Sequence, residues 1–183
     1  MPGPPAPRDV ARTIDLATLF ALGARVGDRL AARGQTVAVA ESSAGGLIAA
    51  ALLARPGASA YFLGGAVVYT RRSRRLLVAL TDGDTAGIRS SSPPYARLLA
   101  RRQRERFGAT WGLAETGAAG PSGNTYGDPA GHACLAVDGP ACPQRALRTG
   151  VADRQANMLA FAAEALALLD AALDAASGGA AEA

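Results

Sequence analysis

The segment AESSAGG (40–46) combines reactive side chains with a glycine pair. Glu41, Ser42 and Ser43 follow a short apolar run, and Gly45-Gly46 is predicted to open a helix. Because a helix N-terminus presents free N–H groups, this turn could bind an anion or an oxyanion. A serine placed there could act as a nucleophile. The simpler alternative is that Ser42 or Ser43 only caps the helix.

A second glycine-rich segment, TGAAGP, comes directly after the predicted strand 110–115. It supplies Thr116, Gly117 and Gly120, and it begins a long loop that runs to residue 131. Ligands of open α/β sheets bind at the carboxyl edge of the strands, and long loops in compact domains usually have a function. We therefore expect this loop and the segment 40–46 to line one pocket.

Between these two segments lies a tyrosine followed by a run of arginines. Gly64-Gly65 is predicted to form a turn before the strand 66–70, which carries Tyr69. Four arginines follow on a predicted helix (71–80), and the second half of another predicted helix (94–107) carries a cluster of four, Arg101, Arg102, Arg104 and Arg106. No aromatic residues are interspersed among them and no nucleic-acid motif contains them, so we expect solvated helix faces and no nucleic-acid partner. The alternative is a basic pocket for a phosphorylated small molecule.

Helical and strand patterns alternate along the rest of the chain. We predict helices at 14–33, 46–55, 71–80, 94–107 and 153–175, and strands at 36–40, 66–70, 110–115, 132–137 and 144–149. The last two strands are expected to form a hairpin. This order predicts a single α/β domain, a three-layer α/β/α sandwich with a mixed central sheet.

Composition limits the classes of protein to which this chain can belong. Hydrophobic residues make up 49% of the 183 residues, and all 19 basic residues are arginine. Residues 1–12 are expected to be a disordered Pro-rich N-terminus, residues 14–175 the folded domain and residues 177–183 a flexible tail. The start of the chain lacks a signal-peptide pattern and no stretch reads as a membrane span, so we expect a cytoplasmic protein without membrane contact. Two cysteines and one histidine predict neither a disulfide framework nor a metal site.

Four segments together resemble the CinA C-terminal domain family, the nicotinamide mononucleotide deamidases. They are AESSAGG (40–46), GASAYFLGGAVVY (57–69), TGAAGP (116–121) and PAGHA (129–133). The segments keep the family's order and spacing. The resemblance covers residues 14–175.

The resemblance implies a serine amidohydrolase that releases ammonia from nicotinamide mononucleotide, with no cofactor. Its catalytic positions fall on Ser42, Tyr69, Arg74 and Thr116, where Ser42 is the nucleophile and Arg74 replaces the lysine base. The same resemblance implies substrate contacts from Glu41, Ser43, Gly45, Gly46, Gly65, Gly117 and Gly120. It also implies a nucleotide as the small-molecule partner and a homo-oligomer.

The arginine at position 74 changes the expected activity. A lysine base must lose its proton, which burial and nearby positive charge can cause, whereas arginine stays protonated. The candidates left for the base are Glu41, His132 and the Tyr69 hydroxyl. We therefore expect weak or absent deamidase activity. The alternatives are a non-catalytic nucleotide-binding or assembly module, and a pocket whose chemistry uses a fixed cation.

Overall fold

The computed structural model describes residues 14–178, which form one five-stranded sheet in the order β2-β1-β3-β4-β5. The strands are β1 (Val37–Glu41), β2 (Phe62–Val67), β3 (Trp111–Ala118), β4 (His132–Asp138) and β5 (Gln144–Arg148). Strand β1 pairs in parallel with β2 and β3, while β4 pairs antiparallel with β3 and β5. The predicted mixed sheet and its C-terminal hairpin are confirmed.

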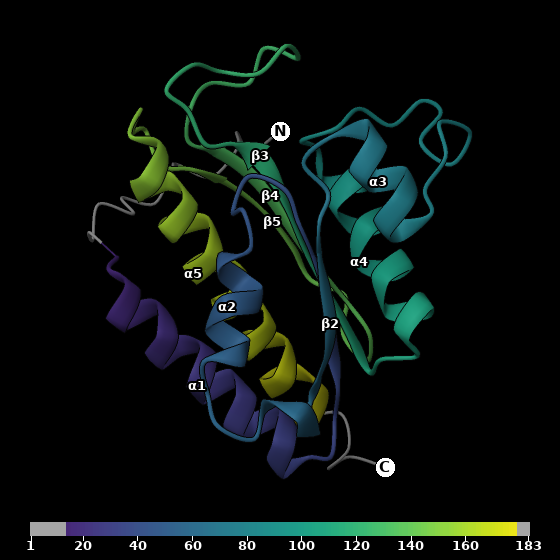
Figure 1. Cartoon of the computed structure of the whole chain (residues 1–183), viewed down its shortest axis with the longest axis vertical. Coiled ribbons are helices and arrows are strands. Elements are labelled where there is room, and N and C mark those ends of the chain that lie inside the picture. Colours follow the sequence, from purple (N-terminus) through teal and green to yellow (C-terminus); the bar gives the residue numbers. More distant parts are fainter. Residues whose placement is uncertain (1–13, 179–183) are drawn as a thin grey trace.

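Helices cover both faces of this sheet, as Figure 1 shows. One layer holds α1 (Leu16–Ala32), α2 (Leu47–Leu53) and α5 (Arg154–Gly178), and the other holds α3 (Arg71–Val78) and α4 (Pro93–Phe107). A short 3-10 turn, η1 (Ala58–Ala60), leads into β2. Two apolar clusters fill the space on either side of the sheet. The three-layer α/β/α architecture is thus confirmed, and it brings the loops after β1, β2 and β3 to one edge.

Local capping signals account for where several helices begin. Asp15, Thr70 and Ser92 each accept a hydrogen bond from a backbone N–H in the first turn of the helix that follows. Such side-chain caps satisfy backbone donors that have no partner within the helix. The motif Ser92-Pro93-Pro94 therefore reads as a cap followed by prolines at the first helical positions, where a missing N–H costs nothing.

The sequence prediction for β2, a strand at 66–70, was wrong in its bounds. Gly64-Gly65 is not a turn but the middle of β2, and the strand ends at Val67, before Tyr69. Gly65 pairs with Val39 of β1, and a Cβ built on it would lie 3.2 Å from the Ala49 side chain of α2. The two glycines interrupted the apolar pattern because they let helices approach an edge strand closely, not because the chain turns there.

Helix α5 is the one described element that is long and apolar enough to cross a membrane. The sequence-based expectation concerned an uninterrupted apolar stretch, and this helix carries Glu164 and Asp170. Most of its apolar window, 61%, is buried within the protein, where Phe161, Leu166 and Leu169 join the same cluster as α1 and α2. Its apolar character therefore reflects core packing. The helix continues through Gly178, beyond the predicted start of a tail at residue 177. The expectation for residues 1–12 lies outside the described residues.

Candidate functional site

The β1–α2 loop contains the predicted nucleophile, and Glu41 organises its helical end. Helix α2 has Gly46 as its N-cap, with φ +100°, a conformation that disfavours side chains. The Glu41 carboxylate accepts hydrogen bonds from the backbone N–H groups of Gly46 (2.9 Å), Ile48 (3.0 Å) and Ala49 (2.8 Å). Neither Ser42 nor Ser43 caps the helix. The donors expected to bind an anion are already occupied by a carboxylate of the protein itself.

Glu115, in the middle of β3, holds the other end of the same loop. Its carboxylate is fully buried and accepts hydrogen bonds from the backbone N–H groups of Ser42 (3.0 Å) and Ala44 (2.8 Å), and from the Ser43 hydroxyl. The sequence analysis missed this residue. The available signal was a carboxylate inside the apolar strand WGLAE, because a charge in a buried strand needs partners.

These two buried carboxylates affect one another's protonation. Burial raises the pKa of Glu41 to about 7, against three backbone hydrogen bonds that favour the charged form, and the Glu115 charge adds to the rise. Burial likewise raises the pKa of Glu115, against hydrogen bonds from the Ser43 hydroxyl and from the backbone groups of Ser42, Ser43 and Ala44. Burial therefore favours the protonated form of both carboxyl groups, whereas the surrounding backbone and hydroxyl donors favour the ionised form.

Ser42 itself is partly exposed. Within residues 14–178, its hydroxyl has no hydrogen-bond partner, so no base in that range is bonded to it. Ser43, in contrast, is 3% exposed and bonded to Glu115. An activated serine nucleophile normally contacts its base directly. The loop presents Ser42 without such a contact.

Arg74, the residue at the base position, is buried in the layer of α3 and α4. It is only 4% exposed, and its Nη2 atom donates to the Asp82 carboxylate at 2.5 Å. Its Nε atom is buried and has no hydrogen-bond partner within the described chain. Asp82 lies on the loop after α3, with 72% of its side chain exposed. The prediction of a solvated arginine face therefore fails at Arg74, although Arg71, Arg72 and Arg75 are exposed.

Tyr69 is 60% exposed and is paired with an arginine from α5. Arg154 donates to the Tyr69 hydroxyl (3.3 Å) through Nη2 and to the backbone oxygen of Gly120 (2.7 Å) through Nη1. Its guanidinium also lies over the Tyr69 ring, 5.9 Å from the centroid. Arg154 was not foreseen from the sequence, because only the fold brings the start of α5 next to the segments after β2 and β3.

The segment TGAAGP packs directly on the β1–α2 loop, as expected from the shared sheet edge. Thr116 is buried opposite Cys134 of β4. A Cβ built on Gly117 would lie 2.3 Å from the His132 backbone oxygen and 3.0 Å from the Ser43 Oγ, so only glycine fits there. A Cβ on Gly45 would lie 2.8 Å from the Met158 side chain of α5. These glycines have a packing reason, and their contact with substrate stays a prediction.

His132 belongs to a separate buried network rather than to the serine loop. Its Nε2 lies 2.9 Å from the Ser91 backbone oxygen and 3.6 Å from the Asp128 carboxylate, while its Nδ1 has no partner within residues 14–178. Burial opposes the ionisation of Asp128, but hydrogen bonds from Arg89 and Asn124 hold its pKa below the usual range. Next to this network, burial raises the pKa of the Cys134 thiol to about 11, so this cysteine is inert at neutral pH.

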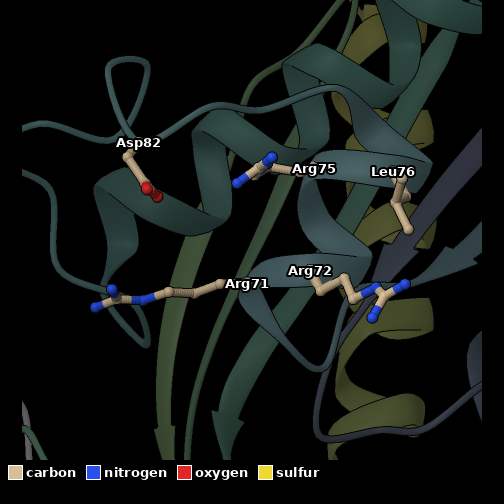
Figure 2. Close-up of a pocket in the computed structure, with 5 residues that line it drawn as sticks. All are labelled: Arg71, Arg72, Arg75, Leu76 and Asp82. Carbon is tan, nitrogen blue, oxygen red and sulfur yellow. The ribbon is translucent and has the colours of Figure 1, made fainter.

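Two cavities lie beside α3, and both carry positive charge. The larger, of about 570 Å³, is an open pocket lined by Arg71, Arg72, Arg75, Leu76 and Asp82. Figure 2 shows Arg71 and Arg72 on the first turn of α3 and Arg75 on the next turn, with Asp82 on the loop that follows. The smaller, of about 250 Å³, is lined by Arg71, Arg74, Asp82, Thr85, Ile88, Ser90 and Tyr126. Neither is lined by Ser42, and within residues 14–178 no three potential metal ligands cluster.

Known proteins share this sequence pattern and this sheet. The sequence matches the CinA C-terminal domain over residues 20–173. The chain belongs to the CinA family. It is 42% identical over 145 residues to a CinA-like protein of Anaeromyxobacter sp. (strain K), covering 79% of this chain and 36% of that protein. A CinA-like protein of Myxococcus xanthus is 40% identical over 143 residues, covering 78% and 34%.

Solved CinA structures share the fold. A competence-damaged protein (CinA) superfamily protein from Klebsiella pneumoniae superposes with a TM-score of 0.79 at 27% identity, covering 86% of this chain and 98% of that one. The competence/damage inducible protein CihA from Agrobacterium tumefaciens gives 0.78 at 30% identity, covering 85% and 95%. This chain spans about a third of the length of the curated CinA-like relatives, so their whole-protein activities do not carry over directly.

Proposed function

We propose that this CinA-family domain binds a nicotinamide mononucleotide-type ligand and that its amide hydrolysis is weak or lost. The observation that carries the proposal is the state of Arg74, buried and paired with Asp82 at the position of the family's base. Arginine cannot release its proton at neutral pH. A hydrolase that depends on this position would therefore lack the group that activates its serine.

The other candidates for a base are each committed elsewhere. The Glu41 carboxylate points to the α2 backbone and accepts three N–H groups. His132 bonds to the Ser91 backbone oxygen, and the Tyr69 hydroxyl accepts from Arg154. Losing a general base costs roughly 10²–10⁴ in rate. The remaining activity would rest on substrate binding, because the backbone donors of the β1–α2 loop are paired with Glu41 and Glu115.

Binding of a nucleotide is supported by features that survive the loss of the base. The segments 40–46 and 116–121 pack together, which keeps backbone and small side chains at the sheet edge. Arg71 and Arg154 add positive charge close to Tyr69 and α3. We further propose a cytoplasmic location and a homo-oligomer, for which the edge strand β2 offers the exposed side chains of Leu63 and Val67.

The test is ammonia release from nicotinamide mononucleotide by the wild type, Arg74→Lys and Arg74→Lys/Ser42→Ala. We expect little release from the wild type and a rise of about 10²-fold or more in Arg74→Lys, since a lysine can act as the base. The double variant should lose that gain. Robust wild-type turnover that disappears in Ser42→Ala would overturn the proposal, and turnover that survives Ser42→Ala would also overturn the assignment of the nucleophile.

A second function, a binding or assembly module without any turnover, is favoured by the unpartnered Ser42 hydroxyl within residues 14–178. It differs from the first in one measurement. Nicotinamide mononucleotide would raise the melting temperature of the wild type, and Arg74→Lys would still release no ammonia. The absence of any thermal shift with nicotinamide or adenine nucleotides would argue against this module.

A further inference from the structure

We infer that the 250 Å³ cavity beside α3 is an oxyanion site, built for a phosphate group, in which Arg74 is the principal donor. The inference rests on the proposed function only in taking Arg74 as a fixed cation rather than a base. It does not require any ligand over Ser42. It assigns to this position a role that a lysine base could not fill.

The first argument is the hydrogen-bonding state of Arg74. A guanidinium has five N–H donors arranged for two-point contact with a phosphate or carboxylate. Arg74 is only 4% exposed, and of its donor atoms only Nη2 is bonded to a protein carboxylate. The Nε donor is buried and unpartnered among the described residues, and the residue lines the cavity. Buried donors normally have partners, so an unpaired donor on a side chain that lines a cavity favours an acceptor bound beside it.

The second argument is the nature of the group that now pairs with Arg74. Asp82 has 72% of its side chain exposed, and its only hydrogen bond as a side-chain acceptor within residues 14–178 is the one from Arg74. An exposed carboxylate is held weakly, because water competes for it and screens the pair. Asp82 can therefore swing into solvent and leave its place to an incoming oxyanion. Asp82 therefore acts as a replaceable counterion of Arg74.

The remaining walls of the cavity suit a phosphate monoester. Arg71 contributes a second positive charge, and Ser90 contributes a hydroxyl that can donate a hydrogen bond. The Thr85 hydroxyl also lines the cavity, but it donates to the backbone oxygens of Thr81 and Asp82. Tyr126, 45% exposed, adds an aromatic wall on which an attached ring could stack. The larger cavity lacks a comparable donor, since Arg72 and Arg75 are exposed to water. Charge alone makes both cavities basic, but the buried, unpaired donor belongs to the smaller one.

The experiment is a titration with sodium phosphate at constant ionic strength, followed in ¹H–¹⁵N spectra that include the arginine Nε–H signals. We expect phosphate to shift the Arg74 Nε–H signal in the wild type. In Arg74→Gln the affinity should fall roughly ten- to hundredfold, as expected for a lost charge-assisted contact. Arg75→Gln is the matched control, because it removes one charge from the same helix and lines only the larger cavity. Its affinity should stay within about twofold.

Asp82→Asn keeps the test decisive if Arg74→Gln does not fold. Removal of the competing carboxylate should tighten phosphate binding by several-fold. The inference is overturned if Asp82→Asn leaves the affinity unchanged, or if Arg75→Gln weakens binding as much as Arg74→Gln. AMP serves as a second probe, and binding tighter than that of phosphate assigns a nucleotide as the ligand. Ammonia release is measured separately, so wild-type turnover would defeat the proposed function while leaving the phosphate result intact.

Discussion

The β1–α2 loop and the start of α3 follow neighbouring parallel strands, yet they handle charge in opposite ways. In the first, Glu41 and Glu115 accept hydrogen bonds from five backbone N–H groups and one hydroxyl. In the second, Arg74 is buried with one replaceable carboxylate and one donor without a described partner. The comparison shows that positive charge available to a ligand lies at α3 and not at the helix N-terminus of α2.

The difference has a simple physical origin. A helix N-terminus attracts any negative group nearby, and Glu41 is close enough in sequence to reach it. A ligand anion would have to compete with a carboxylate fixed by three hydrogen bonds. At Arg74 the competing carboxylate is exposed on a loop, so displacement costs much less.

The largest effect is expected from Glu115→Ala, which removes the acceptor common to Ser42, Ser43 and Ala44. Leaving three donors unpaired in a buried site should lower the free energy of unfolding by on the order of 3 kcal/mol. Urea denaturation at pH 7 measures this. Glu115→Gln, which keeps one acceptor oxygen, should lose clearly less. A loss below about 1 kcal/mol in Glu115→Ala would mean that the loop does not depend on this carboxylate.

The next effect is a pH dependence caused by Glu41. Its pKa is about 7 in the folded protein, against an ordinary value of 4.5, so between these values the folded state binds the extra proton. This contribution to stability is complete below pH 4.5 and is lost as the pH rises through 7, on the order of 2–3 kcal/mol. Urea denaturation at pH 5 and pH 8 should therefore show the wild type losing more stability than Glu41→Gln. An equal loss of stability between pH 5 and pH 8 in the two proteins would contradict a role for Glu41 in this pH dependence.

The smallest effect is expected from Asp82→Asn, on the opposite side of the comparison. Loss of this exposed partner should lower stability by about 1 kcal/mol or less, and added phosphate should recover it by taking its place. Asp28→Asn is the control, since Asp28 is an exposed carboxylate that pairs with Arg55. Phosphate should not restore the free energy of unfolding of Asp28→Asn, as measured by urea denaturation. If phosphate raises the stability of both variants equally, phosphate does not act through Arg74.

The sequence by itself determined the order of elements, because apolar periodicity and capping residues are local properties. It predicted the helices that became α1, α2, α3, α4 and α5, the hairpin of β4 and β5, and the CinA family. It failed at β2, where Gly64-Gly65 resembled a turn, because close helix packing on an edge strand leaves the same signal as a turn.

Only the tertiary structure decided how the charged side chains are paired. Glu41, Ser42 and Arg74 were visible in the sequence, but Glu115, Asp82 and Arg154 became their neighbours or counterparts through contacts between separate elements. Burial is a property of the packed chain, and it turns one arginine of an ordinary basic run into a fixed, partly unsatisfied cation. The sequence determined which groups are present, and the fold determined which of them still lack a partner.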